Sequence, residues 1–348
     1  MKKVYILLST LAVLVFCSSC NDEWKDEQYE HSISFKAPLS NLGVSPIYIP
    51  YYTNVPYQYQ LPLIVSGSTT NNKNITVHVA VDSDTLVALN NAQFSSRTDH
   101  HYTELSSSYF SMPSTVEIKA GEDVGLMQID FTLQGIDLVN KWLLPLKIEE
   151  NDAYTVNGRK HYSKALLHVI PFNAYSETYS GIALSFYSKG YEHLAPIVRQ
   201  TIQTYTVDEN TIFFYAGNID VNRADRGLYK VYAKFNRLSP DGLEEEVDEK
   251  LNSDEFQDVE FGEVVFSTDN DAVLEFDGKT ANYKVTKRKD DVRPYLVIRQ
   301  TTISDIDYEF VDYTDVPGEK FGFVVRGSLI QERKINTQIP DKDQAIQW

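Results

Sequence analysis

Tyrosine is the residue type in this sequence whose chemistry most strongly suggests binding. The chain contains 23 tyrosines among 348 residues. An aromatic ring stacks on the apolar C–H face of a sugar while the phenol hydroxyl hydrogen-bonds, so clustered tyrosines suit carbohydrate capture. One cluster lies in a proline-rich stretch, residues 48–59, and comprises Tyr48, Tyr51, Tyr52, Tyr57 and Tyr59. The alternative interpretation is a small satellite core beneath a loop.

A second group combines aromatic and basic side chains near the start of the C-terminal half. Its members are Tyr187, Tyr191, His193, Arg199, Tyr215 and Arg223. If this half of the chain forms a barrel that is open at one end, these residues would line its mouth. We therefore predict them as ligand-binding residues, with ordinary core and surface packing as the alternative.

Carboxylates are numerous, but their spacing favours structure over chemistry. Within residues 305–310, Asp305, Asp307 and Glu309 alternate with apolar side chains, which predicts a strand with a solvated acidic face. A calcium site or a glycosidase pair is the alternative. Residues 269–271 begin like a calcium loop, but the oxygen ligands that should follow are missing. The seven histidines show no ligand spacing, so we predict neither a metal nor a cofactor.

The familiar catalytic motifs are missing from the sequence. It contains no G-x-S-x-G, H-E-x-x-H, Walker or G-x-G-x-x-G pattern, and no C-x-x-C beyond residue 20. We therefore predict that the protein is not an enzyme. A net charge of −17 also disfavours nucleic acid as a partner, because phosphate is a polyanion.

The first twenty residues are typical of a bacterial lipoprotein leader. Two lysines precede an apolar run of about 13 residues, which is too short to cross a bilayer of roughly 30 Å. Cys20 follows two serines and resembles the lipidated cysteine of a lipobox. We predict a signal peptide over 1–19, an acylated Cys20 that holds the chain on the membrane, and an acidic tether over 20–30. An ordinary secreted protein is the alternative.

The spacing of apolar residues predicts an all-β chain in two domains. Residues 31–172 contain six or seven short strands and one helix near 83–90, which suggests an immunoglobulin-like sandwich. Pro145 interrupts one of these strands and favours an edge or a bulge. Residues 173–348 contain nine or ten strands, and so many edges favour a closed antiparallel barrel. Within them, residues 241–277 carry 15 acids and one base, which predicts a solvated loop and hairpin.

The C-terminal run at residues 332–348, with the stretches 211–217 and 306–310, resembles a family of Bacteroidota surface lipoproteins of unknown function. In that family, a calycin-like domain follows an immunoglobulin-like domain that also occurs in secreted endoglycosidases. Residues 81–82, 116–121 and 144–146 are similar to the latter domain. The resemblance covers nearly all of the mature chain and brings no agreed ligand residues.

This resemblance implies an association with polysaccharide-utilisation loci and a place on the outer membrane, facing the cell exterior. We predict a non-catalytic, surface-anchored glycan-binding lipoprotein that captures an oligosaccharide for an outer-membrane importer complex. The alternatives are a structural or adhesive lipoprotein that binds a protein partner, and a carboxylate-based glycoside hydrolase.

Overall fold

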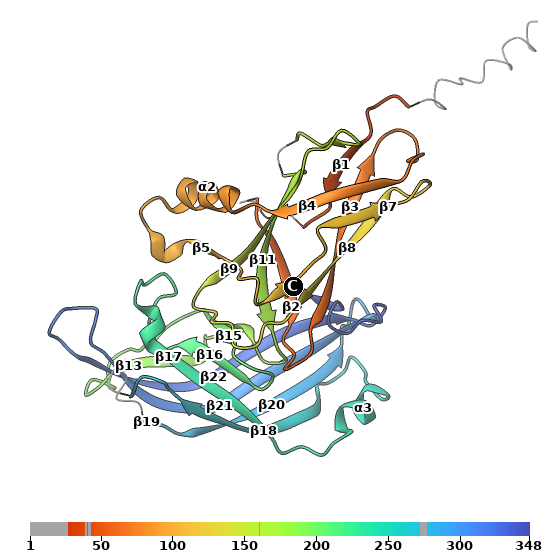
Figure 1. Ribbon diagram of the computed structural model, residues 1–348. Helices are drawn as coiled ribbons and strands as arrows, with labels where there is room; N and C mark the ends of the chain where they lie inside the picture. Colours follow the sequence, from red (N-terminus) through yellow and green to blue (C-terminus); the bar gives the residue numbers. More distant parts are fainter. Residues whose placement is uncertain (1–26, 39, 41–42, 160, 272–276) are drawn as a thin grey trace, which may run out of the picture.

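The computed structural model describes residues 27–348, apart from 39, 41–42, 160 and 272–276 (Figure 1). The signal peptide, Cys20 and most of the acidic tether therefore lie outside the described residues. In the described part of the tether, Glu27 accepts hydrogen bonds from Ser68 and Thr69 and lies 2.5 Å from His31. No helix in the described part of the chain is long and apolar enough to span a membrane.

The N-terminal unit is a sandwich of two sheets. The first has the order β10-β1-β3-β8-β6, and the second has the order β2-β11-β9-β4-β7, with β5 paired to β9. The strands of the first sheet are β1 (Ser32–Phe35), β3 (Tyr57–Ser66), β6 (Phe110–Ser111), β8 (Val124–Phe131) and β10 (Thr155–Val156). Those of the second are β2 (Ser45–Pro50), β4 (Ile75–Val81), β5 (Tyr102–Glu104), β7 (Thr115–Ile118), β9 (Lys141–Ile148) and β11 (Lys164–Phe172). Helix α2 (Ser83–Phe94) and the short η2 (Thr98–His100) lie beside this second sheet.

Alternation of side chains builds the core of the sandwich. In β8, Met127, Ile129 and Phe131 are buried, whereas most of the residues between them point outward. The prediction for Pro145 is wrong, because β9 is an interior strand flanked by β11 and β4. Pairing with β4 ends at Leu146 and pairing with β5 ends at Leu143. Pro145 lies in the gap between these partners, where a missing N–H breaks no ladder hydrogen bond.

The C-terminal unit is a closed antiparallel barrel of eight strands, so the all-β prediction is confirmed. The barrel strands are β12 (Glu177–Ser180), β15 (Thr201–Thr206), β16 (Thr211–Tyr215), β17 (Lys230–Arg237), β18 (Gln257–Ser267), β20 (Thr280–Lys289), β21 (Leu296–Asp312) and β22 (Phe321–Asn336). Short strands extend it at the edges, namely β13 (Leu184–Ser188), β14 (Ile197–Val198), β19 (Asp277–Gly278) and β23 (Ile346–Gln347). Pairing of Ser180 with Ile330 closes the ring, so the long strands have few free edges.

The described part of the acidic stretch at residues 241–277 agrees in part with the predicted solvated loop and hairpin, because an exposed segment precedes β18 and β18 pairs antiparallel with β20 (Thr280–Lys289). It begins with the short helix α3 (Leu243–Asp248) and continues into β18, which is one of the eight barrel strands. In β18, Val259, Val264 and Phe266 point inward while Asp258 and Glu263 are exposed. Most of the described acids lie in α3 and in the segments that flank it before β18, where most are exposed to solvent. Within β18, Glu260 points inward and accepts hydrogen bonds from the hydroxyls of Tyr175 and Tyr283.

The C-terminal tail joins the two units. Trp348 stacks flat on Tyr48 of β2, with ring centroids 4.0 Å apart and an interplanar angle of 6°. Asp343 accepts a hydrogen bond from Tyr52 at 2.5 Å. Arg333 of β22, which is 7% exposed, donates to the backbone carbonyls of residues 173, 174 and 176 in the connection between the units. The signature at the end of the chain is therefore an interdomain clamp.

Candidate ligand-binding site

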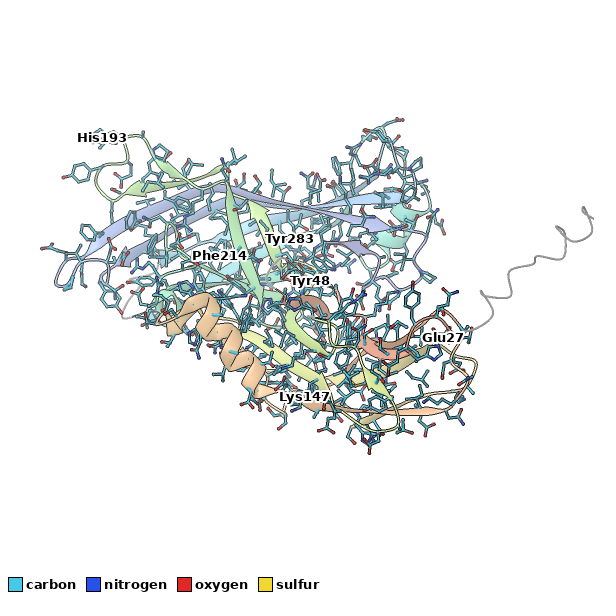
Figure 2. The ribbon with its side chains drawn as sticks, turned by 90° about the horizontal axis from the view of Figure 1, so that it is seen from above. Glu27, Tyr48, Lys147, His193, Phe214 and Tyr283 are labelled. Atoms are coloured by element: carbon cyan, nitrogen blue, oxygen red, sulfur yellow. The ribbon has the colours of Figure 1, made fainter. Side chains whose placement is uncertain are left out.

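A cavity of about 440 Å³ lies where the sandwich meets the barrel. Its volume falls within the roughly 300–1,000 Å³ that small-molecule sites usually occupy. Figure 2 shows Tyr48 at this junction. The sandwich lines the cavity with Tyr48, Tyr102, Leu138, Val139, Asn140, Lys141, His168, Val169, Ile170 and Pro171. The barrel contributes Glu177, Thr178, Gln203, Thr204, Tyr205 and Tyr215, and the connection after β16 adds Val221, Asn222 and Arg226.

Four tyrosines line the cavity, two from each unit. On the barrel side, Tyr205 and Tyr215 lie in one aromatic cluster with Phe213, with the two tyrosine ring centroids 5.7 Å apart. Burial raises the pKa of Tyr205 to about 12, and burial also raises the pKa of Tyr215 and Tyr102. Their hydroxyls are therefore neutral at physiological pH and can both donate and accept hydrogen bonds.

The sandwich side of the cavity carries basic groups. The pKa of His168 in β11 is lowered to about 4 by burial and then by the charge of Lys141, so its imidazole is neutral at pH 7. Its ring meets Tyr102 edge-on at 5.3 Å. The pKa of Lys141 is lowered by burial and by Arg226. Two cations therefore lie close together in a partly desolvated space.

Glu177 at the start of β12 is the unusual residue of the barrel side. Its φ is +95°, a value that a residue with a side chain adopts only at a cost of order 1–3 kcal/mol. Burial raises the pKa of its carboxyl, an effect that Arg333 opposes. Among the described residues, no side-chain hydrogen bond or ion pair engages this carboxylate. A strained, desolvated acid in a cavity marks a candidate binding residue.

The structure divides the six residues predicted to share a barrel mouth. Tyr215 lines the interdomain cavity, and it also lines a neighbouring cavity of about 200 Å³ together with Arg199. Arg199 donates to the backbone carbonyls of Ile219 and Asn218. The guanidinium of Arg223 is held by Asp312 at 2.5 Å and by Asp225 at 2.9 Å. Arg223 thus supports the barrel wall.

The other three predicted residues belong to the hairpin of β13 and β14. Neither cavity that Tyr215 lines includes Tyr187, Tyr191 or His193. Tyr191 is 60% exposed, and its ring lies 6.4 Å from that of His193. Figure 2 shows His193 at the outer end of the barrel, away from Tyr48. β12 pairs with β22 at Ile330, whereas β13 pairs with residues 323–327 of the same strand. The hairpin of β13 and β14 therefore lies outside the closed ring.

The proline-rich tyrosine stretch packs on the main core of the sandwich and forms no separate satellite core among the described residues. Tyr51 is 6% exposed, and Tyr59 packs at an edge-on angle against Phe131. The stretch also receives the C-terminal tail, since Gln344 donates to Tyr57 at 3.4 Å. Of this group, Tyr48 is the one that lines the interdomain cavity.

The acidic strand has the predicted two faces. Ile306, Tyr308 and Phe310 are buried in the barrel, while Asp307 pairs with Lys279 at 3.0 Å. No group of three or more histidines, cysteines, aspartates or glutamates within the described ranges is arranged to hold a metal ion.

Sequence reasoning missed Lys141, His168, Glu177 and Arg226. None of them stands in a motif, and they are up to 85 residues apart along the chain, from 141 to 226. The signal that could have found them is the domain boundary near residue 172, because ligand sites favour domain interfaces.

Comparisons with known proteins give the chain relatives along most of its length. A family model described as a domain of unknown function, DUF4973, matches residues 24–153, and a model of a C-terminal domain matches residues 163–330. No curated protein matches the chain.

Three solved structures are similar over both units. A Bacteroides ovatus protein of unknown function is 37% identical, with 91% of this chain and 100% of that chain covered and a TM-score of 0.78. An auxiliary nutrient binding protein from Bacteroides thetaiotaomicron is 36% identical, with 92% and 100% covered and a TM-score of 0.76. A second Bacteroides ovatus protein of unknown function is 33% identical, with 93% and 97% covered and a TM-score of 0.75. The chain therefore belongs to the family of Bacteroides proteins that these structures represent.

Proposed function

We propose that this protein is a non-catalytic binding protein that captures a small saccharide in the cavity between its two domains. The observation that carries the proposal is the lining of that cavity, to which each domain contributes two tyrosines. Aromatic rings and neutral hydroxyls match the two faces of a sugar. A relative that is named an auxiliary nutrient binding protein, at 36% identity over 92% of this chain, supports a binding role.

The carboxylates of the cavity favour binding over glycoside hydrolysis. Hydrolysis of a glycosidic bond usually requires two carboxyl groups about 5–10 Å apart on either side of the bond. Glu177 is the one acid among the described residues that line the cavity. A single carboxylate can accept hydrogen bonds from sugar hydroxyls, but it provides no acid–base pair.

The proposal includes the membrane attachment that the leader suggests. Acylation of Cys20 would hold the protein on the outer membrane, where a captured saccharide could pass to an importer complex. Mass spectrometry of the protein purified from membranes, beside a Cys20→Ser variant, tests this part. A soluble wild-type protein that carries no lipid would refute it.

Isothermal titration calorimetry against a panel of oligosaccharides tests the binding site. Val221 is 38% exposed at the rim of the cavity, so Val221→Trp should fill the cavity without disturbing the core. We expect this variant to weaken binding at least tenfold. Val198→Trp is the matched control, because Val198 is 47% exposed on β14 and does not line the cavity. Absence of binding at millimolar concentrations, or equal binding by both variants, would refute the proposal.

A further inference from the structure

The interdomain cavity contains two cations that pair with no carboxylate of the described residues. Lys141, the first residue of β9, is half-buried, and its Nζ lies 5.6 Å from the centroid of the Phe94 ring. No ion pair of Lys141 occurs within the described residues. Asp99 is the nearby acid of the sandwich, but its carboxylate pairs with Arg97 at 2.7 Å and lies 3.4 Å from His100. Lys141 therefore keeps an unmatched charge.

Arg226 is the second cation, and its position is fixed by the backbone. It is 7% exposed, and it donates to the carbonyls of Arg223 and Val139 at 3.0 Å and of Asp99 at 3.4 Å. These bonds tie the connection after β16 to the sandwich. Carbonyl oxygens satisfy hydrogen bonds, but they do not cancel a formal charge. The guanidinium is thus pre-organised while its charge remains available to a ligand.

Glu177 does not compensate these cations. It belongs to β12 on the barrel side of the cavity, and Arg333 is the cation that acts on its carboxyl. The acid that acts on Lys141 is instead Asp99, which Arg97 already engages. The described lining of the cavity therefore holds two cations and one acid, in a chain whose overall charge is −17. The local balance is opposite in sign to that of the whole molecule.

We infer that the cavity selects an anionic saccharide, whose carboxylate or sulfate group lies between Lys141 and Arg226. This inference rests on the proposed function and names its ligand class. Partly buried cations without a counter-charge are costly, so an anion that accepts charge-assisted hydrogen bonds from both is favoured over a neutral hydroxyl. The chain's net negative charge is screened over about 8 Å at physiological salt, so selection is local to the cavity.

Calorimetry with a matched set of trisaccharides and disaccharides tests this inference. All three probes contain the neutral lactose unit. Lactose carries no anionic group, 3′-sialyllactose carries a carboxylate, and lactose 3′-sulfate carries a sulfate. We expect at least one anionic member to bind ten times more tightly than lactose. Lys141→Met should remove most of this preference, whereas Lys141→Arg should retain it.

Lys147→Met is the matched control, because Lys147 lies on the same strand and does not line the cavity. It should keep the preference for the anion. Equal affinities for lactose and both anionic sugars, or a preference that survives in Lys141→Met, would overturn the inference. The proposed function would then stand, provided that Val221→Trp still weakened saccharide binding at least tenfold. If wild type bound neither these probes nor any saccharide of the wider panel, the proposed function itself would fail.

Discussion

His168 makes the folded protein sensitive to acid at the sandwich side of the cavity. The residue lies in β11, and its imidazole packs edge-on against Tyr102 near Lys141. Burial, followed by the charge of Lys141, lowers the pKa of this imidazole from 6.5 to about 4. We expect His168→Gln to remove a large part of the acid sensitivity of the folded state.

The magnitude follows from proton linkage. Above pH 6.5 the imidazole is neutral in both the folded and the unfolded chain, so its titration costs the folded state no stability. Between pH 6.5 and 4 the unfolded chain binds a proton that the folded chain does not, so the free energy of unfolding falls as the pH falls. At about 1.4 kcal/mol per pH unit, the interval corresponds to a loss of about 3 kcal/mol by pH 4.

Urea denaturation at pH 7.5 and pH 4.0 measures this loss. Many carboxylates also titrate in this range. For each protein, we therefore subtract the free energy of unfolding at pH 4.0 from that at pH 7.5. The informative quantity is how much larger this loss is in wild type than in His168→Gln. We expect this difference to be about 2–3 kcal/mol. His193→Gln removes an exposed imidazole of the β13–β14 hairpin and is the matched control. If wild type and His168→Gln lost the same stability, the reasoning from burial would be refuted.

Three further changes test the strain and the clamp. Glu177→Gly should remove the strain of the positive φ and raise the free energy of unfolding by about 1 kcal/mol in urea denaturation. Calorimetry should show weaker saccharide binding by this variant. A lower free energy of unfolding would contradict the strain. Arg333→Met leaves the carbonyl of residue 173 without its donor, while the carbonyls of residues 174 and 176 keep Arg299 and Gln331 as donors, so it should cost about 2 kcal/mol in urea denaturation. An unchanged midpoint would count against the clamp. Trp348→Ala loses the stack on Tyr48 and should cost about 1 kcal/mol and increase hydrogen exchange in β2, whereas unchanged exchange would argue against docking of the tail.

Local periodicity predicted much of the fold. Residues 75–81 alternate between apolar and polar side chains and form β4, and the alternation around residues 229–236 became β17 with Val231, Ala233 and Phe235 buried. The predicted helix near 83–90 exists, although α2 continues to Phe94. These elements could be predicted because burial of one face of a strand depends on the order of neighbouring residues alone.

Predictions that depended on which strands lie next to each other in a sheet were less successful. Pro145 suggested an edge, but its tolerance depends on where β4 and β5 end, which local sequence does not encode. The acidic run of residues 241–277 suggested a solvated loop and hairpin, but local sequence did not show that β18 pairs with β17 and β20 as a strand of the closed barrel. In both cases the neighbouring strand decided the outcome.

The candidate site shows the same division. Residue types and spacing were enough to predict the all-β chain that the structure confirms, because strand patterns depend on composition and on short-range order. The leader with Cys20 and the tyrosine-rich binding chemistry stay predictions. Only the tertiary structure placed Lys141, His168, Glu177 and Arg226 around one cavity and moved Tyr191 away from it. The cavity lies between two domains that are joined by contacts such as the stack of Trp348 on Tyr48 and the hydrogen bond from Arg226 to the Val139 carbonyl. Contacts between residues so distant along the chain leave no periodic pattern in the sequence. The tertiary structure therefore decides which charged side chains find a counter-charge.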